Sequence, residues 1–104
     1  MGFFKRPLSE EHELRELCRE VGSNWLKSEL GLVSKDYIND IVVPKLGEVR
    51  RLYQIVVDGA GQKRADAIIQ DSAKFAAGTV MAHGANVVTA IQAAEQFLEQ
   101  NLAE

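Results

Sequence analysis

The feature that most constrains this chain is a repeat of small and apolar residues in its last segment. From Gln62 to Leu102 the chain contains no proline, so no residue there removes a helical hydrogen bond. Eight positions follow each other at alternating steps of four and three residues, and all are apolar or small. This 3.5-residue period is typical of a left-handed coiled-coil contact. The eight positions, called the small-residue seam below, are Ala73, Ala77, Val80, Gly84, Val87, Ile91, Ala94 and Leu98.

The length of this segment conflicts with the size of the chain. One helix over residues 62–102 would be about 62 Å long at 1.5 Å per residue. A compact domain of 104 residues has a diameter of only roughly 33 Å. One possibility is that the helix breaks at His83-Gly84-Ala85-Asn86, with Asn86 as a new N-cap, so that the chain closes into a four-helix bundle. The other is that the helix stays whole and buries its distal half against another protein chain. The repeat crosses Gly84 without a change of phase, which favours the unbroken helix.

A first helix is predicted over about residues 9–30. Ser9 is a suitable N-cap and is followed by acidic residues, which suit the first turn of a helix. Apolar residues then recur at spacings of three and four up to Gly31, a natural helix stop. Gly22 lies inside this pattern and is the point where a break is most easily accommodated.

A second helix is predicted over about residues 35–58, with Ser34 as its N-cap. Pro44 falls inside the apolar pattern, and a short strand at Ile41-Val42-Val43 is the alternative. Because the helical phase continues through the proline, we expect one helix that is kinked or briefly broken there. The turn Asp58-Gly59-Ala60-Gly61 then predicts an antiparallel helical hairpin with the last segment.

These patterns predict an all-α fold, namely an antiparallel helical hairpin or bundle. In the favoured form it has three long helices, and in the alternative the last one is split near residues 83–86 to give four. Residues 1–8 are expected to form a basic N-terminal segment, and residues 9–104 a single helical domain. The three long helices are expected at about 9–30, 35–58 and 62–102.

Composition predicts a cytoplasmic protein with no membrane segment. Hydrophobic residues make up 46% and charged residues 26% of the chain, which is ordinary for a folded soluble domain. The first residues contain no apolar run long enough for a signal peptide. The stretch from Phe75 to Ala94 is uncharged apart from His83, yet it carries Thr, Asn and Gln side chains that would be costly in a bilayer.

Side chains that could carry chemistry are few and scattered. Cys18 lies on the apolar face of the first helix and is expected in the core, and His12 is expected to be solvated. His83 interrupts an uncharged helix and is expected at an interface or partly buried, bonded to a carbonyl. No nucleophile, base and orienting group can be placed together, and no metal-ligand spacing occurs. We therefore predict no enzymatic activity, no cofactor and no metal. A solvated helix surface is expected for Glu10, Glu11, Glu13, Glu16 and Glu20.

One charged region is a candidate for anion contact. Residues 41–64 hold five Lys and Arg but only two Asp and Glu, although the whole chain has a net charge of −3. In a hairpin four of these cations would lie toward the same end, beside the glycine-rich turn. The tip lacks interleaved aromatic residues, so recognition of nucleic acid is not expected. The four residues are Arg50, Arg51, Lys63 and Arg64.

These observations predict a non-enzymatic protein-interaction module, an adaptor or small regulator, that acts through the small-residue seam. The partner is expected to be a second copy of this chain, with a dimer favoured, or another protein. Two alternatives remain open. One is a small-molecule-binding bundle in which Thr79, His83 and Asn86 line a cavity. The other is polyanion or nucleic-acid contact through the basic tip.

Overall fold

A computed structural model describes residues 9–102, and within this range every regular element is helical and no strand occurs. The helix α1 (Ser9–Glu29) is followed by a continuous helical run made of α2, a π-helical turn, a 3-10 turn and α3. A single residue, Gly61, separates this run from α4, and a short corner separates α4 from α5. The bounds are α2 (Lys35–Tyr37), η1 (Ile38–Val42), η2 (Val43–Lys45), α3 (Leu46–Ala60), α4 (Gln62–Val80), η3 (Met81–His83) and α5 (Val87–Leu102).

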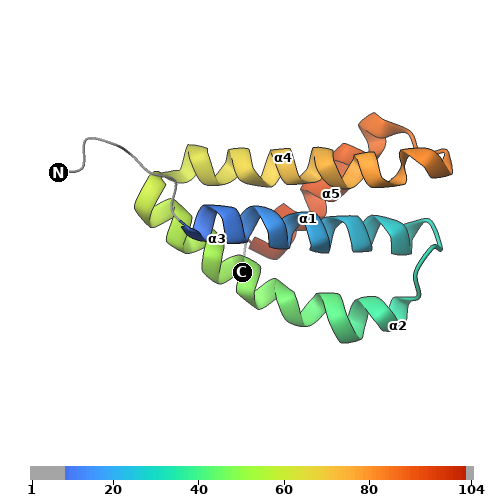
Figure 1. Ribbon diagram of the computed structural model, residues 1–104, viewed down its shortest axis with the longest axis horizontal. Helices are drawn as coiled ribbons and strands as arrows, with labels where there is room; N and C mark the ends of the chain where they lie inside the picture. The colour runs from blue at the N-terminus through green and yellow to red at the C-terminus, as the bar shows by residue number, and fades with distance from the viewer. Residues whose placement is uncertain (1–8, 103–104) are drawn as a thin grey trace.

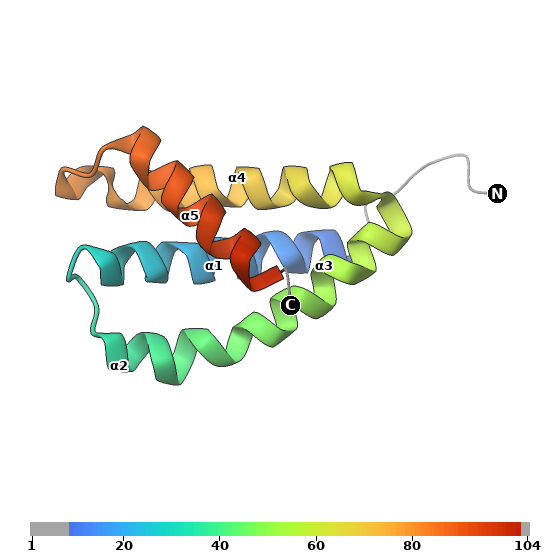
Figure 2. The ribbon, with the colours of Figure 1, turned by 180° about the vertical axis from the view of Figure 1, so that it is seen from behind.

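The elements form an up-down-up-down bundle of four helical segments (Figures 1 and 2). The helices α1 and α4 run in the same direction side by side and share the most extensive contact in the molecule. The run from α2 to α3 returns along one side of this pair, and α5 returns along another. The bundle measures 50 × 26 × 20 Å with a radius of gyration of 14.1 Å. The predicted all-α bundle is confirmed in its four-helix form.

The favoured expectation of one unbroken helix over residues 62–102 was wrong. The helix α4 ends at Val80, and Gly84 adopts a left-handed conformation with φ +82°. Asn86 then caps α5, because its side-chain Oδ1 accepts a hydrogen bond of 3.0 Å from the Thr89 N–H. The reversal lets the apolar face of α5 pack against α4 and α1, so the chain buries within itself the surface that an unbroken helix would expose.

Two glycines near this corner provide a matched test of it. A Cβ added at Gly78 or at Gly84 meets no atom within 4 Å, but only Gly84 has a positive φ. Gly78→Ala should raise the free energy of unfolding by roughly 0.5–1 kcal/mol, because alanine suits a helix better than glycine. Gly84→Ala should lower it by about 1 kcal/mol, because a Cβ strains the left-handed backbone. Urea denaturation of both variants checks the prediction, and equal effects would contradict a left-handed corner.

The two loops that join the first helices follow sequence signals. The α1 helix runs through Gly22 without a break and ends in a Schellman motif at Gly31, where φ is +75°. The Leu32 N–H donates to the Lys27 carbonyl at 2.8 Å, and the Gly31 N–H donates to the Ser28 carbonyl at 3.0 Å. Ser34 then caps the next helix, as expected, through a 3.1 Å hydrogen bond from the Tyr37 N–H.

Pro44 is accommodated inside the helical run, so the predicted kink is confirmed and the alternative strand at residues 41–43 was wrong. The turn before it is π-helical over Ile38–Val42, and the turn that contains it is 3-10 over Val43–Lys45. Proline has no N–H and its ring clashes with a regular preceding turn. The change of helical pitch absorbs this defect while Ile38, Val42 and Leu46 keep their side chains in the core.

The core has two parts of different character. One is filled by large aliphatic side chains of α1, α3 and α4, among them Leu14, Leu52 and Ile68, together with Leu98 of α5. The other lies between the second half of α1, α4 and α5 and consists mostly of alanine. Small side chains there allow close helix approach. The alanine-rich part is formed by Leu26, Ala73, Ala76, Ala77, Val80, Ala90 and Ala94.

Gly22 marks the closest approach of α1 to its neighbours. It is buried, and a Cβ added to it would lie 3.3 Å from the Ala76 Cβ and 3.9 Å from the Leu98 Cδ1. The glycine expected as a break in the first helix is therefore a packing position, where the absent side chain leaves room for α4 and α5.

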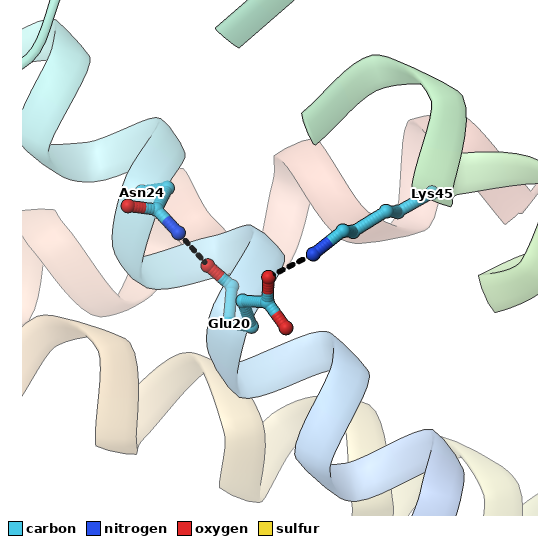
Figure 3. Close-up of polar contacts among 3 residues, drawn as sticks. All are labelled: Glu20, Asn24 and Lys45. Carbon is cyan, nitrogen blue, oxygen red and sulfur yellow. Dashed lines mark hydrogen bonds and ion pairs between the residues drawn. The ribbon is translucent and has the colours of Figure 1, made fainter. Parts of the chain in front are cut away.

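Ion pairs connect α1 with the elements around it. Lys45 of η2 pairs with Glu20 of α1, whose backbone carbonyl also accepts a hydrogen bond from the Asn24 side chain (Figure 3). Arg64 of α4 pairs with Glu11 of α1. Glu11 is only 3% exposed, so the expectation that all five acidic residues of this helix are solvated was wrong for Glu11. Its neighbour α4 covers it and supplies the guanidinium.

Candidate functional site

The small-residue seam is divided between the interior and the surface. Five of its members are fully or almost fully buried inside this chain's own bundle, namely Ala73, Ala77, Val80, Ala94 and Leu98. Their contact surface is taken up by α1 and by the packing of α4 against α5. Ile91 is half-buried, whereas Gly84 and Val87 are exposed at the corner. What the seam leaves for a second chain therefore lies at the corner between α4 and α5.

The four cations considered for anion contact do not gather into a free basic patch. The Arg50 guanidinium donates to the Asn101 carbonyl at 3.1 Å, and Arg51 donates to the Glu48 carboxylate at 2.7 Å. The Arg51 hydrogen bond holds the pKa of Glu48 below its usual value. Arg64 is paired with Glu11. Only Lys63 among the four has no hydrogen-bond or ion-pair partner in the described part of the chain.

The residues considered for a small-molecule cavity are not brought together. Thr79 is half-buried, and its hydroxyl donates to the Ala76 carbonyl of its own helix at 2.7 Å. His83 is exposed in the 3-10 turn, so it is not partly buried within this chain, and its placement at an interface stays a prediction. The broken helix places it on the outside of the corner. Asn86 alone borders a cleft, and its side chain is used to cap α5.

Cys18 and His12 are placed as expected. The Cys18 side chain is fully buried, and desolvation raises the pKa of its thiol to about 12. A thiol in this environment is a poor nucleophile at neutral pH. His12 is exposed on α1.

A polar cleft of about 330 Å³ between α3, α4 and the last turns of α5 escaped the sequence analysis. The Tyr53 hydroxyl donates to the Asp66 carboxylate at 2.7 Å, and the Gln62 amide donates to the same oxygen at 3.0 Å. Partial burial, followed by the bond to Asp66, raises the pKa of Tyr53. These polar atoms satisfy one another and join the two helices on either side of Gly61. The signal that would have found them is the presence of polar residues within about two helical turns on either side of that glycine.

A group of exposed apolar side chains lies at the end of the bundle opposite Gly61. Five large apolar side chains, each 37–59% exposed, lie in the elements that meet there. Two belong to the turn after α1, and three belong to the corner between α4 and α5 (Figure 1). We call this group the apolar end; it consists of Leu30, Leu32, Met81, Val87 and Val88.

An apolar cleft opens at the same end. It has a volume of about 190 Å³ and lies between the last turns of α1, the end of α4 and the first turns of α5. The only polar or charged residues at its edge are Glu29, Asn86 and Thr89. Its apolar lining is formed by Leu26, Leu30, Val80, Ala85, Ala90 and Ala93. No pattern in the sequence indicates this cleft, because it forms only when the last helix breaks.

Comparison with known protein families, curated proteins and solved structures finds no match for this chain. None of the helices described over residues 9–102 combines the length and apolarity needed to cross a membrane. The same residues contain no group of three or more His, Cys, Asp or Glu side chains placed to hold a metal ion.

Proposed function

We propose that this protein is a non-enzymatic helical module that self-associates as a dimer through the apolar end. The observation that carries the proposal is that five exposed apolar side chains and an apolar cleft lie at the same end of the bundle, with Leu30 belonging to both. Contiguous apolar surface on a protein in water is typical of interaction sites, because covering it removes that surface from the solvent.

The charge distribution supports a protein partner at this surface. The corner that carries Met81, Val87 and Val88 belongs to a stretch, from Phe75 to Ala94, that has no Asp, Glu, Lys or Arg. No charge on this stretch has to be desolvated when another surface covers it. The ion pairs of α1 with η2 and α4 involve other parts of these elements. The part of the apolar end that belongs to the corner between α4 and α5 is thus free of the groups that most oppose burial, and Glu29 is the charged residue at the edge of the cleft.

A second copy of this chain is the simplest partner. In a dimer with two-fold symmetry the same patch is covered on both chains, so one interface removes both apolar ends from water. In this dimer the buried members of the small-residue seam hold each bundle together, and Val87 lies in the contact between the two bundles.

Sedimentation equilibrium at micromolar concentration tests this proposal. The wild-type chain should approach twice the 11.5 kDa mass of one chain. Val88→Lys should shift the equilibrium to the monomer, because it places a charge where the most exposed valine, at 59%, would be covered. Gln92→Lys is the matched control, since Gln92 is exposed one turn further along α5. A wild-type chain that stays monomeric, or a Val88→Lys chain that keeps the wild-type mass, would contradict the proposal.

A further inference from the structure

Two small clefts share Glu29 near the end of α1. The apolar cleft has this residue at its edge. A second cleft of about 200 Å³ lies between the last turns of α1 and the start of the helical run from α2, at the same end of the bundle (Figure 2). We call it the charged cleft; it is lined by Trp25, Ser28, Glu29, Lys35, Ile38 and Asn39. Because the two clefts meet at one carboxylate, a single ligand can occupy both.

The apolar cleft has the size of one aromatic ring. Its volume is about 190 Å³, and a cavity of about 150 Å³ lined by aliphatic side chains is enough to bind benzene. Alanines at residues 85, 90 and 93 form much of its wall, with larger side chains from Leu26 and Val80. This cleft therefore suits a phenyl ring better than a polar group.

The charged cleft carries two opposite charges that do not pair with each other. Glu29 and Lys35 both border it, and neither side chain has an ion-pair or hydrogen-bond partner among residues 9–102. Ser28 and Asn39 add a hydroxyl and an amide, which can donate to a carboxylate. Opposite charges that border one cleft without closing on each other match a ligand that carries both an ammonium group and a carboxylate.

An aromatic stack holds together the parts of α1 and α5 that border these clefts. The Trp25 ring lies against the Phe97 ring of α5, with a centroid distance of 4.5 Å and an angle of 11° between the planes. Trp25 lines the charged cleft, and Ala93, one turn before Phe97 on α5, lines the apolar cleft. The walls are thus fixed by contacts within the chain, which lowers the cost of ordering them around a ligand.

We propose that the two clefts together bind an aromatic α-amino acid, with its ring in the apolar cleft, its ammonium group at Glu29 and its carboxylate at Lys35. In such a molecule both charged groups are attached to one carbon, and a single CH₂ group joins that carbon to the ring. This compact arrangement matches an apolar cleft and a charged cleft that adjoin at one residue. The inference goes beyond the proposed function, because the site is complete within one chain.

The first experiment uses L-phenylalanine as the probe, added to the full wild-type chain and to the full chain carrying Val88→Lys. The methyl resonances of Ala90 and Ala93 in the apolar cleft and of Ile38 in the charged cleft should shift together. We expect a Kd on the order of 1 mM, as is usual for a ligand of this size. L-alanine, which lacks the ring, should bind about tenfold or more weakly.

Two substitutions locate the ring. Ala93→Leu adds three carbons to the wall of the apolar cleft and should weaken L-phenylalanine binding about tenfold. Ala67→Leu is the control, since Ala67 is exposed on α4 and lies outside both clefts. Circular dichroism first shows that both variants keep the helical content of the wild type. Equal binding by these two variants overturns the assignment of the ring to the apolar cleft.

Two further substitutions locate the charged groups of the ligand. Glu29→Gln should weaken L-phenylalanine binding about two- to fivefold, but should not weaken binding of hydrocinnamate, which has no ammonium group. Lys35→Gln should have the same effect on L-phenylalanine but should not weaken binding of phenethylamine, which has no carboxylate. Glu13→Gln is the control, because Glu13 is exposed on α1 outside both clefts. If Glu29→Gln and Glu13→Gln bind L-phenylalanine equally, the placement of the ammonium group is overturned.

The chain with Val88→Lys separates this inference from the proposed function. Val88 lines neither cleft, and the proposed function predicts that this variant is a monomer whose clefts no second copy covers. If the variant binds L-phenylalanine, the inference holds whatever the mass of the wild type. If neither the variant nor the wild type shows shifts with L-phenylalanine, the inference is overturned, and sedimentation equilibrium still decides the proposed function.

Discussion

Replacing Gly22 with leucine should lower the free energy of unfolding by about 3 kcal/mol or more, one of the two largest effects we expect from a single substitution. A Cβ at this position already lies 3.3 Å from the Ala76 Cβ and 3.9 Å from the Leu98 Cδ1. The further carbons of leucine therefore have no room unless α1 moves away from α4. Because α1 and α4 share the largest helix contact, this movement would disturb both parts of the core. Urea denaturation followed by circular dichroism measures the loss.

Gly22→Ala is the control that separates overpacking from the removal of glycine. Its Cβ requires the Ala76 methyl to give way by only a few tenths of an ångström, while alanine gains up to about 1 kcal/mol of helix propensity. The cost of the close contact and the gain in helix propensity nearly cancel, so we expect the free energy of unfolding to change by under about 1 kcal/mol. If Gly22→Leu were as stable as Gly22→Ala, the close packing of α1 against α4 would be wrong.

Leu98→Ala should destabilise the bundle by about 2–5 kcal/mol. Leu98 is fully buried and brings α5 into the aliphatic part of the core, where it also borders Gly22. Removing three carbons leaves a cavity between helices that cannot close without moving α5. For a domain of this size the loss corresponds to a fall of roughly 10–30 °C in the melting temperature. Thermal unfolding of the variant and the wild type at equal concentration provides the measurement.

Ile41→Ala is the matched control for Leu98→Ala. It removes the same number of carbons from an aliphatic side chain that is 42% exposed on the π-helical turn. This substitution removes less buried surface and solvent fills the space, so the free energy of unfolding should fall by about 1 kcal/mol or less. Similar losses for the two variants would show that α5 does not pack into the core as described.

Local signals predicted the helices and several of their ends well. Ser34 caps its helix through its side chain, and Gly31 ends α1 with a left-handed residue, because both effects depend on neighbours within a few residues. Pro44 kinks the helical run for the same reason, since its missing N–H and its ring act on the preceding turn. These features needed no knowledge of the partner helices.

The last helix shows where periodicity reaches its limit. The repeat keeps its phase across Gly84, and this continuity favoured one long helix, yet the chain reverses there. The repeat of apolar and small residues can keep its phase across a corner of suitable length, because α4 and α5 each direct their part of the small-residue seam toward α1. Periodicity reports which side chains are buried, and it does not report whether the helix carrying them is straight. The size expected for a domain of this length indicated the correct alternative, a broken helix with Asn86 as the cap of its second part.

The candidate site was the least predictable part of the molecule. The sequence pattern indicated the small-residue seam as the interface, but its members Ala73, Ala77 and Ala94 are buried inside the bundle of one chain. The cleft combines Leu26 and Leu30 of α1 and the turn that follows it with Ala90 and Ala93 of α5. The residues from α1 and its turn are at least sixty positions away from those of α5 in the chain. No local pattern links them, because their proximity depends on how the helices are arranged.

By itself the sequence determined that this chain is helical, where most helices begin and end, and which faces are apolar. These properties follow from backbone sterics, capping and side-chain spacing, which act over a few residues. The tertiary structure decided whether the small-residue seam joins two chains or joins helices of one chain. That choice depends on the left-handed corner at Gly84 and on the room that Gly22 leaves for α4. Once the chain folds back, most of the seam becomes core, and the apolar surface left for a partner moves to the end of the bundle.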